Sequence, residues 1–198
     1  MIPIVLRAVP WRNVVATAGV AAVLGAVGVA VTGAGPTLLA IAFALLAASA
    51  AGVLDEPSSV VVDITPTSSA ARTAIRALAI LVPAATGAAL ITAGALRGPS
   101  LPWTAVALAL AGNILLGFAA ACVVRTRIGE PGPRASVAVL LILILPGLIP
   151  AVARRIQTFP TGVAHGPSAA ALWWPLIGAC ALAIVASQTH AIRQSARF

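Results

Sequence analysis

Six long apolar stretches follow one another along the chain, separated by short breaks that are rich in glycine, proline and arginine. Each stretch is close to the roughly 20 apolar residues that an α-helix needs to cross the hydrocarbon core of a bilayer. The pattern predicts an all-α polytopic membrane protein with a single transmembrane domain, residues 1–198. Its six transmembrane helices are expected at about 13–31, 37–54, 73–96, 103–124, 135–153 and 169–192.

The composition excludes a soluble globular domain. Hydrophobic residues make up 61% of the 198 residues and charged residues only 8%, and the mean hydropathy is +1.09. A soluble domain carries about 25% charged residues, so the outer surface of this chain must face lipid. Arg7 and Arg12 precede a first apolar run that is too long for a signal peptide, and we expect that run to be retained as a helix.

The arginines predict the orientation of the helices. All 12 basic residues are arginines, and the net charge is +8. With the N-terminus in the cytoplasm, the cytoplasmic segments hold Arg7, Arg12, Arg72, Arg76, Arg125, Arg127, Arg134, Arg193 and Arg197. Only Arg97, Arg154 and Arg155 then fall outside, so the positive-inside rule places both termini in the cytoplasm. Because the arginines occur singly or in pairs between apolar stretches, they are typical of topology and headgroup contacts rather than of a nucleic-acid surface.

Tryptophan and small residues predict how the helices meet lipid and one another. Trp11, Trp103 and the pair Trp173–Trp174 fall near predicted helix ends, as in the aromatic belts at the two membrane interfaces. Small residues recur every four positions in the first helix, which permits close helix contact in lipid, although alanine is common enough here to produce such a row by composition. The row is Ala18, Ala22, Ala26 and Ala30, with Gly25 and Gly28 beside it.

The fifth apolar stretch contains two prolines. Pro146 and Pro150 each remove a backbone hydrogen-bond donor, and we expect the helix to break there, in its outer half. The loop that follows, 154–168, is the longest predicted outside connection. It is too short for a domain but long enough for a small re-entrant hairpin.

The link between the second and third helices, 55–72, differs from every other connection. It holds Asp55, Glu56 and Asp63, three of the four acidic residues in the chain. Pro57 suits the first position of a short helix, and a second helix start at Thr65-Pro66 would run through Arg72 and Arg76 into the next crossing. This link therefore has room for a short element at the membrane surface.

No catalytic constellation is present in the sequence. His165 and His190 are predicted on opposite sides of the membrane, and Cys122 and Cys180 lie inside apolar stretches with no metal-ligand spacing. A phosphate-binding loop of the GxxxxGK type is impossible without lysine. We expect no enzyme activity, no metal and no cofactor in this chain.

Asn113 is the most polar residue near the middle of a predicted crossing. A buried amide in lipid needs partners. Two interpretations stay open, an interhelical hydrogen bond that fixes packing or a position on a substrate path. No Asp, Glu or Lys lies mid-crossing, which disfavours an ion-coupled secondary transporter, because such proteins need ionisable or discontinuous sites at the midplane.

The chain resembles the membrane (permease) subunit of type-2 ATP-binding-cassette exporters from actinobacteria. The likeness lies in six crossings, cytoplasmic termini, a proline-containing fifth helix and the segment LDEPSSVVVDITPTSSAARTAIRAL at 54–78. The alanine-rich, lysine-free composition also suits such a source. The resemblance implies a multi-pass protein of the cell membrane that pairs with a second permease chain. Separate ATPase subunits would bind ATP and Mg.

The resemblance also implies a role for the 55–72 link. In such exporters this link carries a coupling helix that sits in a groove of the ATPase. Carried over to this chain, the coupling residues would be Asp55, Glu56, Pro57, Asp63, Arg72 and Arg76. Two alternatives remain, a non-transport scaffold or assembly subunit of a larger complex, and a small secondary transporter. Apolar helix faces fit a drug, a lipid or a peptide equally well, so the sequence leaves the substrate open.

Overall fold

The structure is a computed structural model that describes residues 9–31, 33–55, 69–98, 101–126, 132–149, 152 and 158–195. Within these ranges every regular element is a helix. The elements are α2 (Trp11–Ala30), α3 (Gly35–Gly52), α5 (Ser69–Ala77), η1 (Leu78–Ile80), α6 (Leu81–Ala95), α7 (Trp103–Arg125), α8 (Gly132–Leu148), η2 (Val163–His165) and α10 (Gly166–Ser195). Each of the six predicted ranges overlaps one helix or, for 73–96, the run from α5 to α6.

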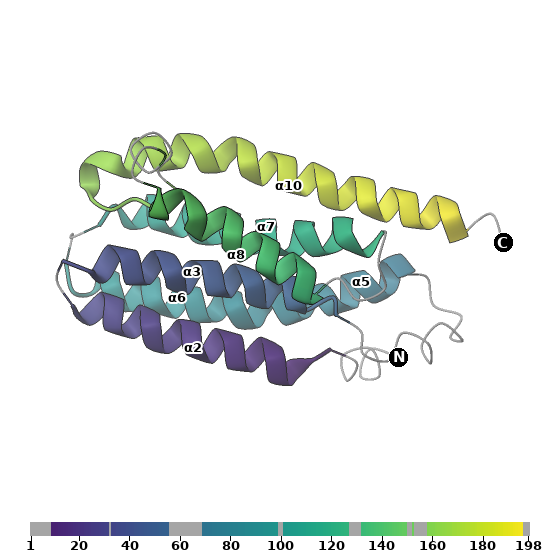
Figure 1. The fold of residues 1–198 in the computed structure, drawn as a ribbon, viewed down its shortest axis with the longest axis horizontal. Coiled ribbons are helices and arrows are strands. Elements are labelled where there is room, and N and C mark those ends of the chain that lie inside the picture. Colours follow the sequence, from purple (N-terminus) through teal and green to yellow (C-terminus); the bar gives the residue numbers. More distant parts are fainter. Residues whose placement is uncertain are drawn as a thin grey trace.

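The long helices lie side by side along one axis (Figure 1). We call the end where α2 begins and α10 ends the terminal end, and the end where α2 leads into α3 the distal end. Five helical stretches are long and apolar enough to cross a membrane: Trp11–Ala30, Gly35–Gly52, Thr73–Ala95, Trp103–Arg125 and Val163–His190. The helix α8 is shorter and also apolar. The fold is therefore that of an all-helical, multi-pass membrane protein.

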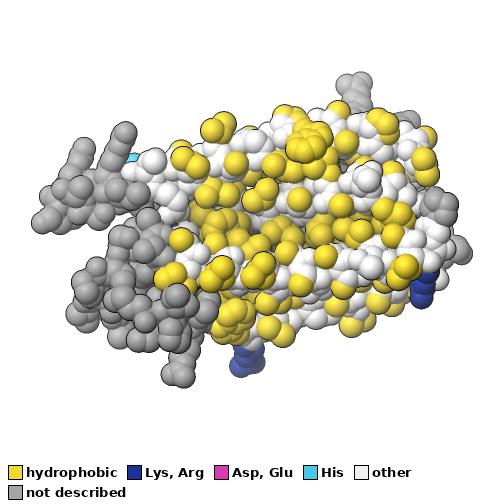
Figure 2. Space-filling view, turned by 180° about the vertical axis from the view of Figure 1, so that it is seen from behind, with side chains coloured by type: hydrophobic (Ala, Val, Ile, Leu, Met, Phe, Trp, Pro, Cys, Tyr) yellow, Lys and Arg dark blue, Asp and Glu magenta, His cyan; other side chains and the backbone are white. Residues whose placement is uncertain are grey.

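The surface agrees with this assignment. Figure 2 shows one face covered by a broad band of apolar side chains, with basic side chains only at its margins. Large apolar side chains are exposed along α2, α8 and α10, for example Val23 on α2, Ile142 on α8 and Leu182 on α10. In water such a surface would cause aggregation, whereas acyl chains cover it without penalty.

Helix α3 is the centre of the bundle and packs against α2, α6, α7 and α8. Small residues make this possible. Gly117 on α7 lies so close to Ala47 of α3 that any side chain at Gly117 would collide with the Ala47 carbonyl oxygen. Two hydroxyls add hydrogen bonds across the same helix: Ser49 donates to the Val14 carbonyl at 3.0 Å and Ser136 to the Ala48 carbonyl at 2.9 Å. Close backbone approach and interhelical hydrogen bonds replace the hydrophobic effect between helices in lipid.

The packed face of α2 differs from the predicted row. The buried residues are Val14, Ala18, Ala21, Gly25 and Gly28, whereas Ala26 and Ala30 are exposed. The buried positions alternate spacings of three and four residues because 3.6 residues complete one helical turn. A strict spacing of four drifts around the helix and leaves the interface.

Pro146 and Pro83 lie inside helices. The helix α8 continues through Pro146 and ends at Leu148, before Pro150 and within the segment where the break is expected. The proline lies in the last turn, where only the Ile142 carbonyl loses its intrahelical donor. In the third crossing, Pro83 likewise removes the donor for the Ala79 carbonyl, and the preceding turn, η1, is a 3₁₀-helix. Pro150 lies outside the described residues.

Candidate functional site

Polar side chains lie near the ends of three helices at the terminal end. Asp55 lies three residues beyond the last residue of α3, Thr73 and Arg76 lie on α5, and Arg125 is the last residue of α7. The Arg125 guanidinium donates from Nη1 to Oγ1 of Thr73 at 3.4 Å. Asp55, Thr73, Arg76 and Arg125 each take part in a polar or electrostatic interaction within the chain. We call these four residues the terminal cluster.

Asp55 joins α3 to α8. Its side chain lies against Gly132, the first residue of α8, and a Cβ added at Gly132 would come 2.7 Å from Cγ of Asp55. The Asp55 backbone N–H donates to the Gly52 carbonyl at 3.1 Å, which holds the residue close to the end of α3. A carboxylate at a helix N-terminus is favoured by the exposed N–H groups and the helix dipole. The glycine is therefore needed so that this carboxylate can reach α8.

Arg76 belongs to the core and not to the exposed surface. None of its surface is exposed, although α5 has charged and polar residues on one side, as an interfacial helix does. A buried guanidinium keeps its charge only when groups within the protein solvate it. Arg76 has such an interaction within the chain, so its role at the start of the third crossing is internal.

The remaining predicted coupling residues cannot be placed in the same way. Glu56, Pro57 and Asp63 lie outside the described residues. Arg72 lies on α5, but its side chain is outside the described part. The structure thus places Asp55 against Gly132 and Thr73 beside Arg125, while Arg76 is buried on α5. Thr73 and Gly132 were not singled out from the sequence, and Arg125 was noted only for topology.

Asn113 lies midway along the 23-residue helix α7 and is 4% exposed. Its side-chain oxygen is buried and accepts no hydrogen bond from any described residue. The interhelical hydrogen bond expected for this residue is therefore not made through Oδ1 within the described part. Leaving a buried carbonyl oxygen without a donor costs about 1–3 kcal/mol, so this position carries an unused acceptor at mid-membrane depth.

The neighbours of Asn113 bring three helices close together. Gly112 is packed so tightly by the Trp173 ring of α10 that a side chain there would collide with the indole. Further along α7, Gly117 meets the backbone of α3. Asn113 thus lies in the segment of α7 that is held between α3 and α10, where a change in helix spacing alters access to its side chain.

An apolar groove opens between α3 and α8 in the distal half of the bundle. Its volume is about 280 Å³. One wall is the start of α3 and the other is the end of α8, and the segment from Thr158 to Thr161 completes it. The lining is apolar apart from the hydroxyls of Thr37, Thr158 and Thr161. Such a lining suits an apolar or amphipathic molecule.

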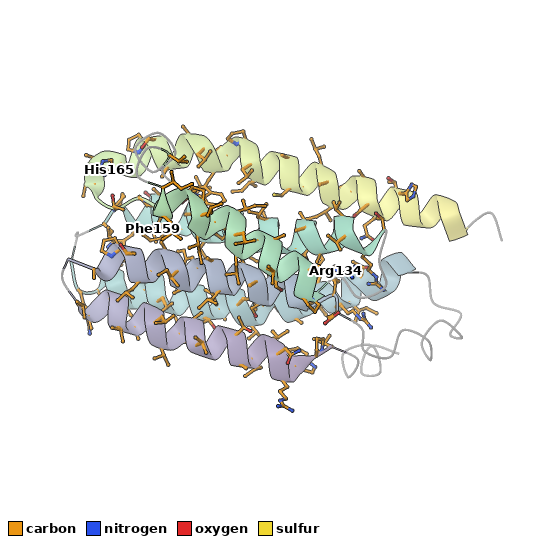
Figure 3. All side chains as sticks on the ribbon, viewed as in Figure 1. Arg134, Phe159 and His165 are labelled. Atoms are coloured by element: carbon orange, nitrogen blue, oxygen red, sulfur yellow. The ribbon has the colours of Figure 1, made fainter. Side chains whose placement is uncertain are left out.

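The segment from Thr158 to Thr161 inserts into the bundle. Phe159 is 6% exposed, and its ring meets that of Phe43 on α3 edge-on, with centroids 5.5 Å apart and an interplanar angle of 77°. Figure 3 shows Phe159 on the distal side, with Arg134 toward the terminal end. Residues 154–157, the first part of the loop 154–168 in which a re-entrant hairpin is predicted, lie outside the described part. The returning part of the loop nevertheless contributes to the core.

Trp173 anchors this segment. It is 1% exposed, and its Nε1–H donates to the Thr158 carbonyl at 2.8 Å. Trp174, by contrast, is 66% exposed. The expectation that both belong to an aromatic belt is therefore wrong for Trp173. Its ring points into the bundle because adjacent residues on a helix face directions about 100° apart.

Comparison with known proteins adds no relative. A scan against protein-family models, a search of curated proteins and a search of solved structures each find no match to this chain. Among the described residues, no three His, Cys, Asp or Glu side chains come together as a metal site would require. The function must therefore be argued from the terminal cluster, Asn113 and the groove.

Proposed function

We propose that this chain is the membrane subunit of an ATP-driven exporter of the type-2 class, located in the cell membrane with both termini in the cytoplasm. The terminal end is then cytoplasmic. Of the seven arginines that the structure describes, six lie toward that end (Arg12, Arg72, Arg76, Arg125, Arg134 and Arg193). The seventh, Arg97, lies at the distal end. This imbalance supports the orientation through the positive-inside rule.

The terminal cluster is the observation that carries the proposal. An exporter must transmit movement from an ATPase at the membrane surface to several helices at once. Next to the 55–72 link, Asp55 lies against the start of α8, and Thr73 on α5 accepts a hydrogen bond from Arg125 at the end of α7. These two contacts are the proposed route by which a force applied to the link reaches α3, α8, α5 and α7.

The groove and Asn113 are the proposed substrate path. The groove lies between α3 and α8, and Asn113 faces the packed middle of the bundle with an unused acceptor. A second permease chain would complete the path. Because the lining is mostly apolar, we propose that the substrate is apolar or amphipathic.

The first experiment identifies the partner. The tagged chain is purified from its native membrane, and the proteins that accompany it are identified by mass spectrometry. We expect an ATP-binding-cassette ATPase in stoichiometric amount, and the chain alone should hydrolyse no ATP. Recovery of a stable assembly without any ATPase would contradict the proposal and favour the scaffold alternative.

The second experiment separates docking from internal roles. Asp55→Asn should lower the stability of the chain by about 0.3–1 kcal/mol, because the carboxylate favours the α8 N-terminus. Glu56→Ser keeps a good helix cap and removes only a charge. If the link docks on an ATPase, Glu56→Ser should leave the unfolding midpoint of the isolated chain unchanged but weaken assembly or uncouple ATP hydrolysis. The matched control is Glu130→Gln, which removes the one acidic residue outside the link.

A further inference from the structure

A second cavity lies at the distal end and shares only Pro36 and Thr161 with the lining of the α3–α8 groove. Its volume is about 720 Å³, within the range of roughly 300–1,000 Å³ that is usual for small-molecule sites. The last turn of α2, the start of α3 and the end of α6 line it, together with Leu101 and Trp103. We call it the distal cavity.

The walls of the distal cavity are closely packed. At one side, α2 and α3 approach at Gly28 and Gly35, where a Cβ on Gly28 would lie 3.0 Å from the Gly35 carbonyl oxygen. At the other side, the Trp103 ring packs directly on Gly94, and its Nε1–H donates to the Gly98 carbonyl at 3.2 Å. The glycines at these contacts let the helix ends that border the cavity pack closely against their neighbours.

One charged residue, Arg97, lines this cavity. It is exposed, and its guanidinium makes no hydrogen bond or ion pair with a described residue. Among the described residues the one carboxylate side chain is that of Asp55, which lies at the terminal end against Gly132. Arg97 is therefore open to an anion from another molecule.

Arg97 also departs from the charge distribution of the chain, because it places a positive charge at the distal end, where such charges are few. It lies two residues beyond the apolar stretch Thr73–Ala95, which is long enough to cross a membrane, so we expect it among the lipid headgroups. We propose that the distal cavity binds an anionic amphiphile, a phospholipid whose phosphate pairs with Arg97 and whose acyl chain lies against the cavity wall. A guanidinium suits this partner because its planar fork matches two phosphate oxygens. This inference depends on the membrane-spanning fold and not on the exporter function.

The test uses the purified full chain in nanodiscs of zwitterionic phosphatidylcholine, to which phosphatidylglycerol is added. We expect native mass spectrometry to retain phosphatidylglycerol in preference to phosphatidylcholine. Arg97→Gln should reduce that preference about fivefold to tenfold, since one arginine near a charged headgroup contributes about 1 kcal/mol and 1.4 kcal/mol is tenfold. Arg134→Gln, which removes an exposed arginine at the terminal end, is the matched control and should keep the preference.

A second variant tests the cavity itself. Ala30 is exposed and borders the distal cavity. Ala30→Phe should therefore fill part of the cavity without a steric clash in the helix interface. Retention of phosphatidylglycerol should fall while Arg97 remains in place, and the unfolding midpoint in phosphatidylcholine reports whether the variant is folded. Equal losses in Arg97→Gln and Arg134→Gln, or no preference in the wild type, would overturn the proposal. If free inorganic phosphate at millimolar concentration displaces phosphatidylglycerol, the proposed contact between the acyl chain and the cavity wall is contradicted. Displacement by a fatty acid would support that contact.

Discussion

Arginine side chains have opposite environments at the two ends of the bundle. At the terminal end, Arg76 is completely buried, and Arg125 on α7 donates to Thr73 on α5. At the distal end, Arg97 is exposed beside an apolar cavity, and no acidic side chain of the described residues meets it. The same residue type is structural at one end and open to a ligand at the other. The difference arises because charge is useful inside a membrane protein only where other polar groups surround it.

The aromatic residues follow the same contrast. The distal half contains the contact between Phe43 and Phe159 and the anchor from Trp173 to Thr158. These contacts close that half of the bundle by packing, whereas polar contacts close the terminal end. An exporter that is driven from the cytoplasm would need such an arrangement, with a stiff polar end that receives force and an apolar end that separates to release cargo. This interpretation belongs to the proposed function and is tested with it.

The largest effect is expected at Arg76. Arg76→Met approximately keeps the side-chain length but removes the buried positive charge, so the groups that interact with Arg76 lose their cation. Loss of one member of a buried charged cluster should lower the free energy of unfolding by about 3 kcal/mol. Denaturant titration of the chain in mixed micelles measures it. Arg12→Met, at an exposed site on α2, is the control and should change little. Equal stability of the two variants would contradict the division between buried and exposed arginines.

The next effect is expected at Phe159. Phe159→Ala removes a buried ring and its edge-on contact with Phe43, and we expect a loss of about 2–3 kcal/mol in the same titration, below the usual range for core phenylalanines because the segment can partly collapse. Trp174→Ala, at an exposed aromatic residue nearby in sequence, should be almost neutral. If Phe159→Ala is equally neutral, the inserted segment does not contribute to the distal core.

A smaller effect, with an informative sign, is expected at Asn113. Because its side-chain oxygen lacks a donor among the described residues, Asn113→Leu should leave stability within about 1 kcal/mol or raise it. Substrate stimulation of ATP hydrolysis in the assembled complex should nevertheless fall if the residue lies on the path. A clear loss of stability with unchanged stimulation would instead assign Asn113 to helix packing.

The smallest effect is expected at Arg97 when no anionic lipid is present. Arg97→Gln in phosphatidylcholine should have the unfolding midpoint of the wild type, because the guanidinium has no partner among the described residues. Adding phosphatidylglycerol should then raise the midpoint of the wild type only. An Arg97→Gln chain that is already less stable without this lipid would show that Arg97 is structural, as Arg76 is.

Some features of the candidate site could be anticipated from the sequence, and others had no sequence signal. Asp55 stood out because acidic residues are rare here and gather in one link, and Asn113 because amides are rare in crossings. The sequence did not distinguish Gly132, Thr73 or Phe159, since glycine, threonine and apolar residues are common in this chain. Their roles come from the helices that surround them, which are distant in sequence.

The sequence by itself determined the class of the protein and the number and approximate extents of its long apolar segments. Lipid offers the backbone no hydrogen bonds, so an apolar run of sufficient length has to form a helix, whatever its neighbours are. Only the tertiary structure decided which side of each helix is packed. Both the lipid-facing and the core-facing sides are apolar, so the row in α2 was misassigned and Trp173 could not be distinguished from Trp174. The contrast between polar and apolar faces that reveals packing in soluble proteins is absent here, and shape complementarity takes its place.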